Sequence, residues 1–260
     1  MLSFILFLVA AVLIFSLVYF WNKRSKTTIH AGESKEIRKA LEKNISFYRQ
    51  LAGNKKESFA KRVEKFLSKT KITPVGNFDL TVEDRVYVGA SAIIPIASFE
   101  DWEYNNLNEV LIYPDNFNND FDFKEKQANI LGMVGDGALN RIMILSLPAL
   151  KHGFEHNDGH NTGIHEFVHL IDMADGEVNG IPLYLLTKDN ISPWMNYMKQ
   201  TLQDIRDDDT GLNPYAGKNA TEFFAVIAEY FFEKPQMLEN EHPEIYRLLK
   251  KMFTPDLNTK

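Results

Sequence analysis

The sequence predicts an α+β fold that is mainly helical, has a small mixed sheet and is preceded by one N-terminal transmembrane helix. Three observations support this prediction: an uncharged apolar run at the N-terminus, several segments with apolar residues at helical spacing, and two short apolar segments typical of strands. The chain has 260 residues, of which 45% are hydrophobic and 25% are charged. This composition excludes disordered, collagen-like and disulfide-scaffold sequences.

The N-terminal run at residues 2–21 contains no charged side chain and, as a helix, would span about 30 Å of hydrocarbon. It lacks the basic start and the small-residue cleavage site of a signal peptide. Lys23, Arg24 and Lys26 flank only its carboxyl side. The positive-inside rule therefore predicts a single-pass protein of the bacterial inner (cytoplasmic) membrane, with the lipid bilayer as a partner and the large domain in the cytoplasm.

The expected organisation is a membrane anchor at residues 1–24, a linker and first helix at 25–44, and one large domain at 45–260. Apolar residues recur at helical spacing in several segments. The predicted helices are Glu33–Leu51, Lys55–Ser68, Gly163–Ala174, Ser192–Ile205, Asn219–Phe232 and Pro243–Met252.

Two short apolar segments, Glu109–Tyr113 and Arg141–Leu147, predict strands, and Asp84–Ala97 could be either a strand or a buried helix. Strands followed by helices favour an α+β domain over a doubly wound parallel sheet.

Charge and cysteine content exclude several classes of function. The net charge is −6, whereas a surface that reads phosphates is normally basic, so no direct binding of nucleic acid is expected. The chain has no cysteine, which excludes thiolate nucleophiles, disulfides and cysteine-type zinc sites.

The sequence His165-Glu166-Phe-Val-His169 is the motif with the most chemical content. On a helix, residues four apart lie on one side, so both imidazoles can bind one metal ion while Glu166 stands beside them. An apolar face on the same helix would anchor it in the core. The alternative is a pair of surface histidines on an amphipathic helix. A catalytic zinc also needs a third protein ligand and an open position for water.

Glu222 is the candidate for the third ligand. It belongs to a strongly apolar helical segment, and a carboxylate on such a core helix needs a partner. A metal ion would be a suitable partner for this carboxylate. The alternative is a capping box, because Asn219 stands three residues before Glu222.

The chain resembles the family of zinc metallopeptidases typified by Mlc titration factor A, which is similar in its active-site pattern to the catalytic domain of anthrax lethal factor. The resemblance covers roughly residues 45–253. Its motifs are Asp158-Gly-His-Asn161, His165-Glu-Phe-Val-His-Leu-Ile-Asp172, Gly180-Ile-Pro182, Tyr215, Glu222-Phe-Phe-Ala-Val and Glu229-Tyr-Phe-Phe.

This resemblance implies a zincin-like metallopeptidase domain with one Zn²⁺ per chain. It implies metal ligands at His165, His169 and Glu222, a general base at Glu166, and a hydroxyl donor at Tyr215. From the residue alone, Tyr215 would be interpreted as a packing residue. Members of the family are usually soluble, so the predicted anchor is an addition.

Asp172 and Glu229 each lie about two turns from a candidate ligand on the same helix and could accept the second N–H of an imidazole. Roles at the helix surface or in capping are equally open for them. His152, His156 and His160 recur every four residues, but the intervening glycines favour a loop over a second metal site.

The three aspartates at residues 207–209 lack the spaced ligands of a calcium loop, so a solvated turn is predicted there.

The expected function is that of a membrane-anchored zinc peptidase, in which a metal-activated water attacks the peptide bond and Glu166 acts as the base. The expected substrates are short peptides or chain termini, as for an aminopeptidase, and the edge of the strand Arg141–Leu147 is expected to pair with an extended substrate. The alternative is a zinc-stabilised binding protein that sequesters a cytoplasmic transcriptional regulator, since the family is named for a protein that binds a repressor.

Overall fold

The computed structural model of this chain describes the residues in four ranges, which are 31–125, 128–135, 137–206 and 211–254. The predicted transmembrane helix at residues 2–21 and the acidic run at 207–209 lie outside the described residues. Within the described ranges, no helix combines the length and the apolar composition needed to cross a bilayer.

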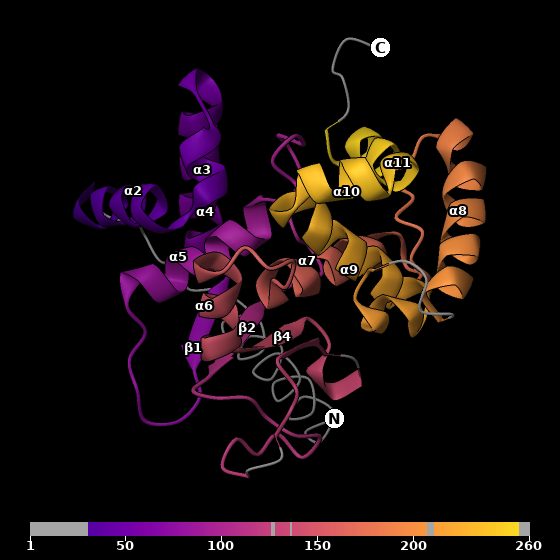
Figure 1. The fold of residues 1–260 in the computed structure, drawn as a ribbon. Coiled ribbons are helices and arrows are strands. Elements are labelled where there is room, and N and C mark those ends of the chain that lie inside the picture. Colours follow the sequence, from indigo (N-terminus) through magenta and orange to yellow (C-terminus); the bar gives the residue numbers. More distant parts are fainter. Residues whose placement is uncertain (1–30, 126–127, 136, 207–210, 255–260) are drawn as a thin grey trace, which may run out of the picture.

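A four-stranded mixed sheet packs beside the helix that carries the paired histidines (Figure 1). Its strands, in spatial order, are β1 Lys71–Pro74, β2 Glu109–Tyr113, β4 Ile142–Ser146 and β3 Gly132–Val134. Strands β1, β2 and β4 run parallel, and β3 runs antiparallel to β4. The prediction of a small mixed sheet is therefore confirmed.

Both faces of the sheet are covered. Val110 and Met143 are paired neighbours on one face and belong to the main core. On the opposite face, Ile144 packs in a separate cluster with Tyr113 and Phe117. Strands covered on both faces form near-continuous apolar runs, and this is why the sequence identified β2 and β4.

Helices make up most of the described chain and lie mainly on one side of the sheet (Figure 1). They are α2 Ala31–Asn44, α3 Ser46–Gln50, α4 Gly53–Lys69, α5 Val82–Ile93, α6 Leu147–Glu155, α7 Thr162–Asp172, α8 Lys188–Arg206, α9 Ala220–Glu233, α10 Pro235–Glu241 and α11 Pro243–Phe253. Three short 3-10 helices are η1 Gly137–Leu139, η2 Met173–Asp175 and η3 Pro214–Gly217.

The ambiguous segment Asp84–Ala97 is helical over most of its length, as α5. Its start is fixed by a capping box, in which Thr81 Oγ1 accepts from Asp84 N at 3.1 Å and the Asp84 carboxylate accepts from Thr81 N at 2.9 Å. The predicted helix Glu33–Leu51 is interrupted, because Ile45 is extended and separates α2 from α3.

Other boundaries were predicted wrongly or missed. Helix α8 begins at Lys188, so Ser192 and Pro193 lie within it and do not start it. His152 was expected in a loop but lies in α6, which begins with a cap from Ser146. The sequence also missed α10 and the strands β1 and β3, because elements of three to seven residues are too short to show a period.

Helix α7 is anchored by the apolar face that the sequence predicted. Phe167 is fully buried, and its ring lies 5.6 Å from that of Phe66 on α4 and 5.1 Å from that of Tyr104. The cap of the helix is Asn161, whose Oδ1 accepts from Ile164 N at 2.9 Å. The orientation of α7 about its own axis is therefore set by packing, and its polar side faces away from the aromatic cluster.

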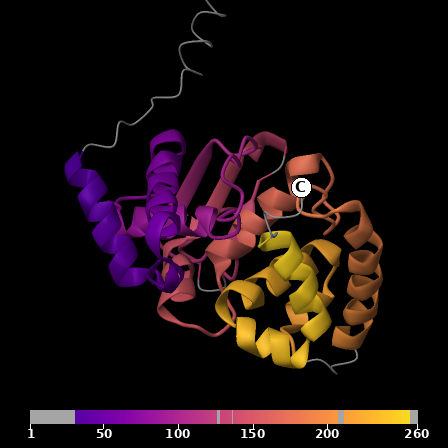
Figure 2. The same cartoon turned by 90° about the horizontal axis from the view of Figure 1, so that it is seen from above.

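Helix α9 packs along α7 and is buried on nearly all sides, as its apolar sequence predicted. The rings of Trp194 from α8 and Phe253 from α11 lie 5.8 and 6.1 Å from that of Phe224. Figure 2 shows the sheet and the N-terminal helices on one side of α7, and helices α8 to α11 on the other. Helix α7 thus joins the two halves of the fold.

We expect Phe167→Ala to lower the free energy of unfolding by about 3–5 kcal/mol, because it leaves a cavity between α7 and its aromatic neighbours. Leu183→Ala is the control, since Leu183 is 48% exposed and should cost less than about 0.5 kcal/mol. Chemical denaturation of both variants measures the difference. Equal costs would show that Phe167 does not anchor α7.

Candidate metal centre

Helix α7 presents His165 and His169 on one side, as their spacing predicted. Their Nε2 atoms lie 3.0 Å apart, and both imidazole side chains are about one-eighth exposed. The cap at Asn161 fixes where the helix begins, and the buried face fixes which way the two rings point. The surface-histidine alternative is wrong, because both rings are largely buried.

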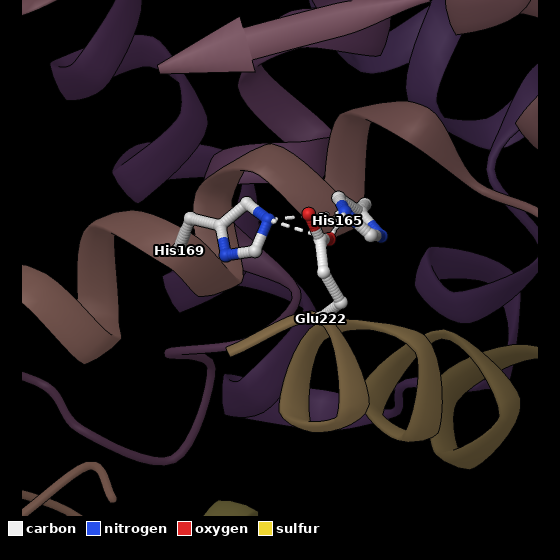
Figure 3. Close-up of side chains that lie close together, drawn as sticks. All are labelled: His165, His169 and Glu222. Atoms are coloured by element: carbon white, nitrogen blue, oxygen red, sulfur yellow. Dashed lines mark hydrogen bonds and ion pairs between the residues drawn. The ribbon is translucent and has the colours of Figure 1, made fainter. Parts of the chain in front are cut away.

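Glu222 reaches the two imidazoles from the first turn of α9 (Figure 3). Its Oε2 lies 3.1 Å from His165 Nε2 and 3.4 Å from His169 Nε2. Asn219 caps the helix by accepting from Glu222 N at 2.9 Å, so the backbone follows the capping alternative. The carboxylate does not complete a capping box, and it faces the histidines instead.

These three side chains fit a metal ion. Each offers one ligand atom, and the three atoms lie within 4.8 Å of one another. Among the described residues, this is the only set of three or more such groups, and His152, His156 and His160 do not form one. Two imidazole nitrogens and one carboxylate oxygen are a donor set that suits zinc and leaves room for a fourth ligand.

The electrostatics of the site favour positive charge beside Glu222. Burial lowers the pKa of the His165 imidazole, but its hydrogen bonds with Glu222 and Glu229 outweigh burial and raise that pKa to about 10. Burial raises the pKa of Glu222, but its hydrogen bonds with His165 and His169 hold it well below the usual range. A bound divalent cation would replace the proton on His165 as the positive charge beside Glu222.

Glu229 is the partner of the second nitrogen of His165. Its Oε1 lies 2.7 Å from His165 Nδ1, and the carboxylate is 5% exposed. Of the roles left open for Glu229, the structure shows the contact with an imidazole. A carboxylate in this position selects the tautomer in which Nε2 is free to bind a metal.

Asp172 does not contact an imidazole nitrogen. Its Oδ2 accepts from Gly180 N at 2.9 Å, while its Oδ1 and the buried His169 Nδ1 have no partner among the described residues. Of the roles left open for Asp172, the structure shows a contact with the backbone after α7 and none with an imidazole nitrogen. The reason is geometric: the carboxylate turns toward the loop that follows α7.

Gly180, in that loop, lets the chain after α7 lie directly against the start of α9. Its φ is +71°, and a Cβ there would lie 2.2 Å from the Ala220 carbonyl oxygen at the start of α9. Its own carbonyl accepts from Trp194 Nε1 at 2.7 Å. Glycine is needed because the backbone is left-handed and touches α9 directly, two residues before Glu222.

Glu166 lies beside the candidate ligands without joining them. It is 5% exposed, and burial raises its pKa. A Cβ on Gly132 would lie 2.8 Å from Glu166 Cγ and 2.9 Å from its Oε1, so only glycine lets strand β3 come so close. The carboxyl group is thus held between α7 and the edge of the sheet.

Tyr215, in η3, donates a hydrogen bond from its hydroxyl to Glu222 Oε1 at 3.0 Å. Its side chain is 46% exposed, so the packing alternative is wrong. Lys218, which the sequence analysis missed, lies over the Tyr215 ring and donates to the Tyr215 hydroxyl and to Glu222 Oε1 at 3.1 and 3.2 Å. Its position four residues before Glu222 was the available signal.

A cleft of about 830 Å³ opens onto this site. Its lining includes His165, Glu166, Tyr215 and the segment from Asn129 to Gly132. The strand predicted to bind substrate, Arg141–Leu147, corresponds to β4, and both of its edges are occupied by β2 and β3. That prediction is wrong, and β3 is the edge strand that borders the cleft.

Two imidazoles and a carboxylate that can hold a metal ion, beside a cleft and a buried carboxyl group, form the class of site found in metal-dependent hydrolases. Comparison with known proteins agrees. The sequence profile of the family described as glucose-regulated metallopeptidase M90 matches residues 19–254. The chain therefore belongs to the M90 metallopeptidase family, which confirms the resemblance found in the sequence.

Individual relatives are similar over most of their length. The chain is 30% identical to protein slr2042 of Synechocystis sp. over 80% of each chain. It is 25% identical to Mlc titration factor A of Pectobacterium atrosepticum, covering 82% of this chain and 84% of the relative. For Mlc titration factor A of Yersinia enterocolitica the identity is 26%, and the coverage is 82% and 83%.

We expect Gly180→Ala to lower the free energy of unfolding by about 2–4 kcal/mol, because the added methyl group collides with the Ala220 carbonyl. Gly176→Ala is the matched control: its φ is +96°, but nothing lies within 4 Å of the added Cβ, so only about 1 kcal/mol is expected. Thermal or chemical denaturation measures both. If the two variants lose the same stability, Gly180 does not set the contact between α7 and α9.

Proposed function

We propose that this chain is a membrane-anchored, zinc-dependent peptidase in which His165, His169 and Glu222 bind the metal and Glu166 is the general base. The observation that carries the proposal is the convergence of three ligand atoms within 4.8 Å, from two helices, beside a cleft that also reaches Glu166. Membership of a metallopeptidase family supports the same chemistry.

When bound, zinc supplies a water of lowered pKa and polarises the substrate carbonyl. Glu166 accepts the proton of the attacking water and passes it to the leaving amine, so that hydrolysis needs no covalent intermediate. Burial raises the pKa of Glu166, which brings this carboxyl group closer to the working pH and makes it a better proton carrier.

Tyr215 is the proposed donor to the tetrahedral oxyanion. Its hydroxyl now donates to Glu222 Oε1, and turning toward the cleft would free it for the substrate. Lys218 remains within 3.2 Å of the same Glu222 oxygen and can satisfy it when Tyr215 turns away. A positioned oxyanion donor contributes about 3 kcal/mol to transition-state stabilisation.

The proposed substrates are short peptides or exposed chain termini, as for an aminopeptidase. A cleft of about 830 Å³ is of the size that holds a small ligand or a few residues. The outer edge of β3 borders the cleft and is the proposed site for an extended peptide to add as a strand. Residues 2–21 are the proposed anchor in the inner membrane, with the peptidase domain in the cytoplasm.

The second candidate function is a regulatory binding protein that sequesters a cytoplasmic transcriptional regulator. The observation that favours it is the name of several relatives, Mlc titration factor A. Glu166 distinguishes the two functions, because a zinc site that only stabilises a fold does not need a general base.

We expect Glu166→Gln to keep its zinc and to lower hydrolysis of a mixed peptide library by about 10²–10⁴-fold, because it removes only the proton carrier. Elemental analysis and peptide mass spectrometry measure the two properties. Glu177→Gln, an exposed change in the loop after α7, is the control and should retain activity. If the wild type binds zinc and a regulator but cleaves no peptide, the binding function is the correct one.

We expect Glu222→Ala to weaken zinc binding by more than about 100-fold, since losing a direct ligand costs more than losing a supporting group. Competition with a chelator measures the affinity. Glu239→Ala, an exposed change on α10, is the control. Unchanged zinc affinity in Glu222→Ala would remove Glu222 from the ligand set.

A further inference from the structure

Glu229 and Glu233 lie one turn apart on α9, and both bind the segment that leads into α7. Glu229 Oε2 accepts from Asn161 N at 2.5 Å. Glu233 accepts from Asn161 Nδ2 at 2.9 Å through Oε1 and from Gly159 N at 3.0 Å through Oε2. Two carboxylates thus bind Gly159 and Asn161, just before the helix that carries the paired histidines.

Asn161 connects three helices. Its Oδ1 caps α7 by accepting from Ile164 N, and its Nδ2 donates to the Gly153 carbonyl in α6 at 2.7 Å as well as to Glu233 in α9. The side chain is 1% exposed. Its amide therefore makes all its contacts inside the protein, and each one limits where α7 can begin.

The same contacts reach His165. Glu229 uses one oxygen for His165 Nδ1 and the other for Asn161 N. Its carboxylate plane is thus set jointly by the imidazole and by the position of Asn161. Glu233 holds the Asn161 side chain, so it acts on the imidazole through two hydrogen-bonded neighbours.

Glu233 is an unusual residue for this task, because it accepts hydrogen bonds only from neutral N–H groups. The charged groups that act on it, Glu229 on its own helix and Asp158 in the loop before α7, are both negative. Burial first, and then these two carboxylates, raise the pKa of Glu233 to about 7. An ionised Glu233 accepts both hydrogen bonds. A protonated one turns an O–H toward an N–H and loses one of them.

We propose that Glu233 is a positioning residue that holds Asn161 and Glu229 in place and thereby orients His165 for metal binding. The two hydrogen bonds that Glu233 accepts from Gly159 N and Asn161 Nδ2 form a clamp, which is complete only when Glu233 is ionised. The inference rests on the proposed metal site. It adds a residue that neither the motif nor the ligand set contains.

The sign of the pH dependence follows from the raised pKa. Above about pH 7 the carboxylate is ionised and the clamp is intact, and below that pH the proton removes one contact. Glu233→Gln mimics the protonated form at every pH, because its amide offers one acceptor and one donor group.

The test compares the zinc dissociation constants of the full-length wild type and Glu233→Gln between pH 6 and pH 8.5, by competition with a chelator. We expect Glu233→Gln to bind zinc about 10-fold more weakly at pH 8.5 and within about twofold of the wild type at pH 6. At each pH we take the ratio of the dissociation constant of Glu233→Gln to that of the wild type. The effect of histidine protonation on zinc binding cancels in this ratio, because both proteins share it. Glu241→Gln, an exposed change on α10, is the control and should match the wild type throughout.

A ratio that stays constant with pH, or that remains near one at pH 8.5, would overturn the proposal. If Glu233→Gln does not fold, an NMR titration of the wild type tests the proposal instead. The resonances of the Asn161 side-chain amide should then titrate with a midpoint near pH 7. An absence of titration would also overturn the proposal. A wild type that binds no zinc would instead overturn the proposed function. The two failures are therefore distinguishable.

Discussion

The contact between α7 and α9 is the constraint on which the site depends. Two histidines on one helix offer two ligand atoms, and the third comes from a helix far along the chain. Only side-by-side packing of the two helices brings Glu222 Oε2 to 3.1 Å from His165 Nε2. That packing is made by buried aromatic residues, and Gly180 permits the close approach of the loop after α7 to α9, because a side chain there would collide with the Ala220 carbonyl.

Four carboxyl groups share the space around the two histidines, and each has a different contact. Glu222 faces the imidazoles, Glu229 holds the second nitrogen of His165, Glu166 lies under strand β3, and Glu233 binds the backbone before α7. Burial raises the pKa of Glu166 and of Glu233, whereas hydrogen bonds with the imidazoles hold the pKa of Glu222 below its usual range. Such separation of pKa values lets neighbouring carboxyl groups take different chemical roles.

The sheet contributes to the site through one edge. Because β4 lies between β2 and β3, the strand that stands out in the sequence is unavailable to a substrate, and the short strand β3 borders the cleft. Gly132 on this edge lets Glu166 approach the backbone. Strand β3 therefore shapes the cleft, although the sequence analysis did not identify it. A strand of three residues is too short to show a periodic pattern.

The sequence by itself determined the local features: the α7 helix with its two histidines on one side, the cap at Asn161, the buried character of α9, and strands β2 and β4. These follow from spacing and residue type within a few turns of chain. Tertiary structure decided the rest. It turned Glu222 from a capping residue toward the imidazoles, assigned Glu229 rather than Asp172 to His165, and placed β3 at the cleft. Each of these outcomes depends on the relative placement of elements distant in the chain, and local periodicity carries no information on that placement.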